Sequence, residues 1–83
     1  FGAQCRYAWD KIKRLLDKHG ATVENVDKVV TYVTDIRYFF DAGKCRAAAY
    51  AGATQPAGTF LVVTALAWPG MLIEVDVTAS AAK

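Results

Sequence analysis

The chain has 83 residues, of which 54% are hydrophobic and 22% are charged. This length allows one small domain, over residues 1–83, and excludes two separate domains. The composition is typical of a chain that builds a hydrophobic core, so disordered and collagen-like proteins are excluded. No apolar run approaches the roughly 20 residues that span a bilayer, so we exclude a membrane protein.

The charge balance argues against a nucleic-acid partner. Ten Lys and Arg residues against eight Asp and Glu residues give a formal net charge of +2. Such a small excess does not provide a phosphate-neutralising surface. Much of the positive charge lies in residues 6–18, interleaved with Asp10 and Asp17, and this pattern predicts a solvated helix face.

The chain contains two cysteines, Cys5 and Cys45, and a single histidine, His19. This count excludes a disulfide framework and a zinc ligand set, so we expect no metal cluster. Both cysteines are interpreted as small buried hydrophobic residues, because a nucleophilic cysteine needs a nearby base and His19 is distant in sequence. These features favour a reducing, cytoplasmic location.

The first predicted element is an amphipathic helix. Its apolar residues recur at helical spacing on one face. They are Cys5, Ala8, Trp9, Ile12, Leu15 and Leu16. His19 and Gly20 are expected to end the helix, since glycine tolerates the left-handed cap conformation. The chain starts at Phe1 without a methionine, so we expect an upstream segment to be missing.

Next come a predicted strand and a second predicted helix. The segment Val26–Thr34 is rich in β-branched residues with apolar groups on both faces, which indicates a strand interior to a sheet. Asp35 is a plausible N-cap for a helix over Ile36–Ala51. Gly43 weakens the middle of that helix by about 1 kcal/mol relative to alanine.

The last third of the chain is predicted to be a hairpin. After a loop at Gly52–Gly58, strands are expected over Thr59–Leu66 and Met71–Thr78, joined by a turn at Pro69-Gly70. The tail Ala79–Lys83 is expected to fray.

The predicted order of helix, strand, helix, strand, strand indicates an α+β fold in which two helices cover one face of a sheet. Val30 and Tyr32 place apolar groups on the other face, for which no third helix remains. Self-association is the economical way to cover that face.

Four segments together resemble a known family. They are residues 4–6, 19–36, 53–57 and 72–77, and they occur in the family's order at nearly its spacing. The family is the Rid or YjgF-like group, also called L-PSP endoribonuclease-like. The resemblance implies a chorismate-mutase-like α+β fold, a homotrimer, and the absence from this chain of the family's N-terminal strands. A companion chain is one source of these strands, and a cleaved precursor or a fragment of a longer chain are the alternatives.

The same resemblance implies a function. Rid proteins hydrolyse reactive enamines and imines to keto acids and ammonia without a cofactor. The substrate lies in a cleft between subunits, where an arginine holds its carboxylate. An alternative is a non-catalytic trimeric module that binds a ligand or a partner. Ribonuclease activity is the weakest alternative, because no histidine pair, metal set or basic groove supports phosphodiester cleavage.

The resemblance also assigns site residues, with two departures. Glu74 matches the family's acidic residue, and we interpret it as the catalytic group that orients or activates a water. The loop residues Gln55, Ala57, Gly58 and Thr59 are interpreted as ligand-binding. Gly58 stands where the family has its arginine, so the carboxylate clamp is absent, and the family's asparagine aligns with Gly43.

Several other residues are open to a functional or a structural interpretation. Asp76 shares a strand face with Glu74, where solvent exposure is the simpler interpretation. Four aromatic residues on the second helix would either line a ligand pocket or pack in the core, and we favour core packing for most of them. The four are Tyr38, Phe39, Phe40 and Tyr50. Trp68 is expected in the turn and at a subunit contact.

Overall fold

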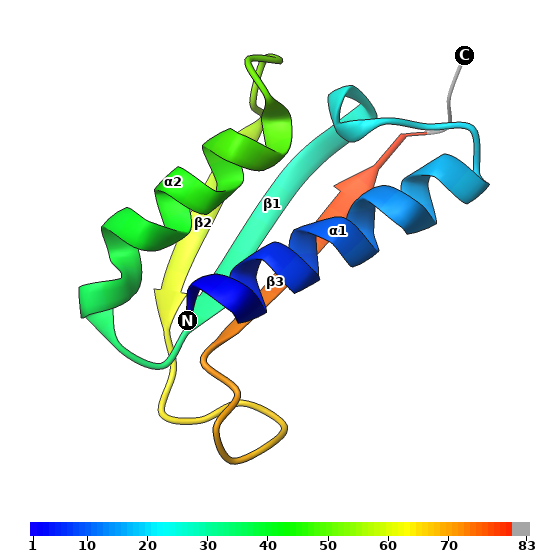
Figure 1. Cartoon of the computed structure of the whole chain (residues 1–83). Helices are drawn as coiled ribbons and strands as arrows, with labels where there is room; N and C mark the ends of the chain where they lie inside the picture. Colours follow the sequence, from blue (N-terminus) through cyan, green and yellow to red (C-terminus); the bar gives the residue numbers. More distant parts are fainter. Residues whose placement is uncertain (81–83) are drawn as a thin grey trace.

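The computed structural model describes residues 1–80 of the chain. It contains two α-helices, three strands and two short 3-10 helices in an α+β arrangement (Figure 1). Their bounds are α1 Gly2–Lys18, η1 Val23–Asn25, β1 Val26–Val33, η2 Ile36–Tyr38, α2 Phe39–Tyr50, β2 Ala57–Val62 and β3 Ile73–Ala79. The predicted order of helix, strand, helix, strand, strand is confirmed.

Helix α1 forms and ends as its sequence predicts, except that Leu15, predicted on its buried face, is 49% exposed. Cys5, Trp9 and Leu16 are buried, because the apolar stripe of the helix faces the sheet. The helix stops at His19, whose Nδ1 atom lies 2.9 Å from the carbonyl oxygen of Leu15. Gly20 follows with φ at +70°, a left-handed conformation that favours glycine.

Strand β1 lies in the centre of the sheet, as predicted. The strand order is β2-β1-β3, with β1 parallel to β2 and antiparallel to β3. Alternate residues of β1 point to opposite faces. Val29 and Val33 are fully buried under the helices, whereas Val30 and Tyr32 are half-buried on the opposite face.

The predicted hairpin is wrong, because β2 and β3 lie on opposite sides of β1 and do not pair. The segment that joins them passes the end of β1, where the Val63 N–H donates to the Val33 carbonyl and the Thr34 N–H donates to the Leu72 carbonyl. Strand β2 occupies one edge of β1, so an antiparallel strand added to β1 takes the free edge. The predicted turn at Pro69-Gly70 does form, inside this connection.

The second helix is shorter than the predicted range of 36–51. Its first turn is the separate 3-10 helix η2, and α2 begins only at Phe39. Asp35 caps η2, since its Oδ1 atom accepts a hydrogen bond from the Arg37 backbone N–H at 2.8 Å. The predicted capping role of Asp35 is therefore confirmed, at a 3-10 turn.

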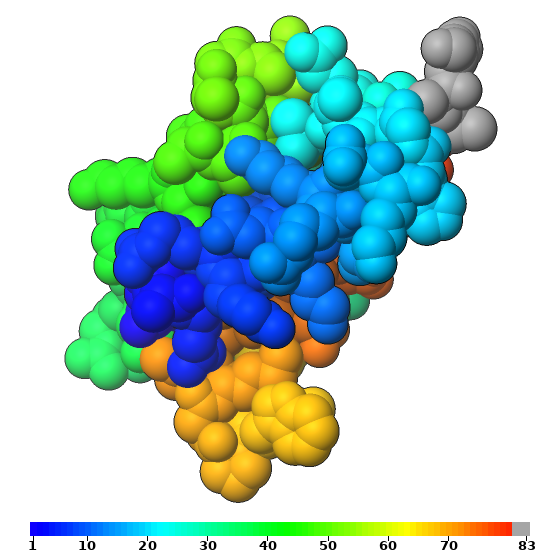
Figure 2. Space-filling model, turned by 45° about the vertical axis from the view of Figure 1, so that its right-hand side comes forward, coloured from blue at the N-terminus to red at the C-terminus, as the bar shows by residue number. Residues whose placement is uncertain are grey.

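Both helices lie on one face of the sheet, with α1 along β3 and α2 along β2 (Figure 1). Among residues 1–80, no element covers the other face. The connection between β2 and β3 projects beyond the N-terminal half of α1 (Figure 2). Within the described range, no helix is both long and apolar enough to cross a membrane. Ala79, predicted to fray, ends β3, and residues 81–83 of the predicted tail lie outside the described residues.

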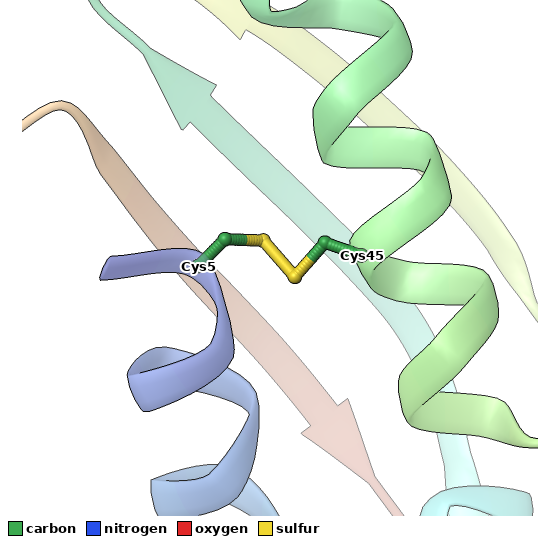
Figure 3. The surroundings of a disulfide bond; sticks show 2 residues. All are labelled: Cys5 and Cys45. Atoms are coloured by element: carbon green, nitrogen blue, oxygen red, sulfur yellow. A yellow bond between two sulfur atoms is a disulfide. The ribbon is translucent and has the colours of Figure 1, made fainter. Parts of the chain in front are cut away.

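The two cysteines form a disulfide, so the exclusion of a disulfide was wrong, although Cys5 is buried as predicted. Cys5 in the first turns of α1 and Cys45 in the middle of α2 point toward each other above the sheet (Figure 3). Their Cα atoms are 6.4 Å apart, within the usual range for a disulfide. Helix packing brings together two residues 40 apart in sequence. The pairing removes one ground for a cytoplasmic location, which stays a prediction.

Candidate functional site

A groove of about 520 Å³ lies between the N-terminal half of α2 and the start of β2. We call it the α2–β2 groove. Its walls include residues of both elements and of the preceding loop, among them Phe39, Phe40, Arg46, Gln55, Gly58 and Phe60. Three of the four loop residues predicted to bind a ligand, Gln55, Gly58 and Thr59, line this groove. The fourth, Ala57, is the exposed first residue of β2.

Among residues 1–80, Arg46 is one of two cationic side chains that line this groove, with Lys44. Its Nη2 atom donates a hydrogen bond of 2.6 Å to the Pro56 carbonyl oxygen, and its guanidinium carbon lies 5.9 Å from the centre of the Tyr50 ring. The Nε atom is buried without an acceptor among the described residues. The loop carbonyl and the Tyr50 ring therefore hold the guanidinium against the start of β2.

The aromatic residues of the second helix divide between core and groove. Tyr50 is buried, with its ring edge-to-face against Trp9 at 5.7 Å, and burial raises the pKa of its hydroxyl. Tyr38 is half-buried and stacks on Phe1. Phe39 and Phe40, in contrast, are 50% and 75% exposed and line the α2–β2 groove. The core interpretation is wrong for these two residues, because the first turn of α2 extends past the edge of β2.

Glu74 is not part of the α2–β2 groove. It lies on β3 opposite Tyr32 of β1, whereas Thr59 on β2 lies opposite Val30. These side chains share the helix-free face, with β1 between their two strands. The Gly58 position, in contrast, faces the helices, because its partner Val29 is buried beneath them. Glu74 is exposed, as is Asp76 on the same strand.

A second groove, of about 720 Å³, lies between α1 and β3 and is called here the α1–β3 groove. Tyr7 and Leu15 on α1 line it and are 63% and 49% exposed. Trp68, which is 70% exposed, lines its end. Glu74 borders the groove as well. Its walls are mainly apolar, and the adjacent strand β3 is an edge of the sheet.

Comparison with known proteins matches this architecture to one family. A family model described as Endoribonuclease L-PSP matches residues 1–81. The chain belongs to this L-PSP family. A search of curated proteins found no match.

Solved structures support the assignment of this L-PSP chain. A member of the YjgF/YER057c/UK114 family from Mycobacterium tuberculosis is 36% identical, with a TM-score of 0.87 over 94% of this chain and 65% of its own. A Rid-family protein of unknown function from Yersinia pestis is 33% identical, with a TM-score of 0.85 over 95% of this chain and 61% of its own.

A protein of unknown function from Pseudomonas aeruginosa is also 36% identical, with a TM-score of 0.86 over 90% of this chain and 54% of its own. The L-PSP chain therefore spans roughly three fifths of the length of these relatives. These comparisons confirm the predicted family and the predicted fold.

Arg46 was missed by the sequence reasoning, although a signal for it exists. Ala42, Ala49 and Tyr50 are the buried residues of α2, and position 46 lies one turn from each of them. Positions three and four residues away from Arg46 carry no carboxylate to pair with it along the helix. Arginine is rarely buried unless it is paired with an opposite charge, so an unpaired arginine on the buried side of a helix marks a candidate functional residue.

Proposed function

We propose that this L-PSP chain is a cofactor-independent hydrolase or deaminase that acts on an enamine or imine metabolite in a cleft between the subunits of a homotrimer. Family membership supports this reaction class, because it is the one that the Rid resemblance implies. Glu74 is the proposed catalytic residue, which would orient or activate the attacking water. Gln55, Ala57, Gly58 and Thr59 would line the substrate side of the cleft.

One observation supports a cleft shared between two copies of the chain. In a single chain, Glu74 lies on the opposite side of β1 from the loop that supplies Gln55 and Gly58, which opens toward α2. A site that uses both sets of residues therefore needs the Glu74 of one copy beside the loop of another. The helix-free face, with Tyr32 half-buried and Leu61 43% exposed, is the surface through which copies would associate.

The reaction is tested with an imine made in place by an amino-acid oxidase. Wild-type protein should release ammonia faster than the uncatalysed rate, and Glu74→Gln should lose that acceleration because the amide is not a base. Asp76→Asn is the matched control, since Asp76 lies two residues along the same face of β3, and it should keep the activity. Release of ammonia at the uncatalysed rate by wild type rejects the proposed reaction.

The second candidate function is a non-catalytic trimeric module that binds a ligand or a partner. Gly58 favours it, because this position lacks the arginine that the resemblance predicts for the catalytic members. This module predicts ligand binding without turnover, and binding that is unchanged in Glu74→Gln.

The assembly is tested by native mass spectrometry. A species of three times the 9.0 kDa chain mass supports the homotrimer, and a well-folded monomer in dilute solution rejects the shared cleft. We also propose that further strands, from a companion chain, join the free edge of β3. The apolar α1–β3 groove supports this location, since added strands would cover Tyr7 and Leu15. A companion of this kind would appear as an added mass.

A further inference from the structure

The Arg46 guanidinium fills the space that a Cβ atom of residue 58 would occupy. A Cβ atom at residue 58 would overlap the Nη1 atom of Arg46 and lie 3.3 Å from its guanidinium carbon. The guanidinium therefore lies directly over the Cα atom of Gly58, at the point where β2 begins beside β1. A larger residue at position 58 would therefore have to displace the guanidinium, so glycine leaves the space that Arg46 uses; its φ angle is not in the left-handed region.

The guanidinium in this position has unused hydrogen-bonding capacity. An arginine carries five N–H donors. Among the described residues, the Arg46 guanidinium donates one hydrogen bond, to the Pro56 carbonyl oxygen. No carboxylate within residues 1–80 pairs with it, and the ion pair that is formed joins Arg37 to Asp35 elsewhere. Lys44 lines the same groove, and no acidic side chain does. The α2–β2 groove therefore carries uncompensated positive charge.

Three aromatic side chains, Phe39, Phe40 and Phe60, line the same groove as this charge. Phe39 contacts Phe40 and Phe60 edge-to-face, with ring centres 5.4 and 5.0 Å apart. Phe39 and Phe40 remain largely exposed, although aromatic side chains gain free energy when they are covered. A groove lined, among residues 1–80, by two cationic and three aromatic side chains suits a small organic anion with an apolar body.

We infer that Arg46 determines ligand specificity in the α2–β2 groove, by binding the carboxylate of a small organic acid whose apolar part lies against Phe39, Phe40 and Phe60. The inference deepens the proposed function and rests on it for the reaction, but binding can be measured without turnover. Arginine suits this role because its planar fork donates two parallel hydrogen bonds to a carboxylate. The cation would come from helix α2, and Gly58 would leave the space that it needs.

The test is a titration with benzoate, followed by the backbone amide resonances of Gln55, Gly58 and Phe60. Benzamide is the neutral probe of the same shape. A ligand of this size is expected to bind at millimolar concentration. Arg46→Gln should weaken benzoate binding about tenfold or more, because a charge-assisted pair is lost. Arg14→Gln removes the same charge from the exposed side of α1 and should leave the affinity within about twofold.

Two further variants separate this role from a merely structural one. Gly58→Ala keeps every charge but displaces the guanidinium, so it should weaken benzoate binding as Arg46→Gln does. Arg46→Lys keeps the charge but loses the fork, so its affinity should fall between wild type and Arg46→Gln. If Arg46→Gln does not give a folded spectrum, these two variants decide the question.

Three results would overturn the inference. They are benzoate binding that is unchanged in the Arg46 variants, benzamide binding as tight as benzoate binding, and no benzoate-dependent shift at the groove in the wild type. Ammonia release is a separate measurement. Arg46-dependent benzoate binding without ammonia release would reject the proposed reaction and keep this inference, whereas ammonia release with Arg46-independent binding would do the reverse.

Discussion

Cys5 and Cys45 join the first turns of α1 to the middle of α2, across a segment that contains the central strand β1. Cys5 is fully buried, and Cys45 is half-buried. The bond therefore lies within the layer formed by the two helices on the sheet (Figure 3). It fixes the spacing of these helices, and so the position of α2 relative to β2 and the α2–β2 groove.

Removing this disulfide should destabilise the fold substantially. For a closed loop of 40 residues, the loss of chain entropy in the unfolded state corresponds to about 4 kcal/mol. The double variant Cys5→Ala, Cys45→Ala should show that loss in urea unfolding. Wild type treated with a reductant should shift in the same direction, while the double variant should not respond to the reductant. An unchanged wild-type midpoint under reducing conditions would contradict the prediction.

Substitution of two glycines by alanine should have opposite effects on stability. Gly58→Ala places a methyl group against the Arg46 guanidinium, whose displacement breaks its hydrogen bond to the Pro56 carbonyl and should cost about 0.5–1.5 kcal/mol. Gly43→Ala lies in α2, where the added methyl group would meet no atom within 4 Å beyond its chain neighbours and the adjacent helix backbone, so it should gain up to about 1 kcal/mol. Chemical denaturation of both variants checks the pair. Equal effects would mean that Arg46 moves aside without cost.

Gln4 should contribute to stability through its side-chain amide. Its Nε2 atom donates to the Gly70 carbonyl, and its Oε1 atom accepts from the Leu72 N–H, both at 2.8 Å. Gln4→Ala leaves the part-buried Leu72 N–H without a partner and should cost about 1–2 kcal/mol. Gln4→Glu keeps the acceptor for Leu72 but sets a carboxylate oxygen against the Gly70 carbonyl, so it should also be destabilising. Gln55→Ala, an exposed control of the same type, should be near neutral in thermal unfolding.

The ion pair of Asp35 with Arg37 should make stability pH-dependent. Hydrogen bonds from the Arg37 guanidinium and from its backbone N–H lower the pKa of the Asp35 carboxyl from its usual 3.8. A lowered pKa in the folded state stabilises the fold above the unfolded pKa, and the effect is lost as pH falls through the folded value. Because the pair lies at the surface, with the Arg37 side chain 84% exposed and the Asp35 side chain 31% exposed, water screens it and the effect should be small.

Asp35→Asn keeps the capping acceptor and removes the charge, so it isolates this effect. Its melting temperature should lie below that of wild type at neutral pH, and the gap should close as pH falls below about 4. In an Arg37→Gln background the gap should shrink at all pH values. A gap that widens toward acid pH would contradict the assigned cause.

Part of the candidate site could be predicted from the local sequence pattern, and part could not. Gln55, Gly58 and Thr59 lie together because they are close in sequence, at the junction between the loop and the start of β2. The alternation of strand residues correctly placed Glu74 and Asp76 on one face, opposite Tyr32 and Val30. Position along the chain did not reveal that α2 brings a cation over Gly58, because that contact depends on how far α2 lies from β2.

The sequence by itself determined the features that form between near neighbours. The apolar stripe of α1, the cap at Asp35, the left-handed Gly20 and the turn at Pro69-Gly70 all arise within a few residues, so their side chains and peptide groups decide them. Only the tertiary structure decided that β3 takes the free edge of β1, that the two cysteines meet, and that Arg46 lies over Gly58. Each of these joins segments distant in the chain, and their approach depends on which strand edges pair and how the helices pack above them.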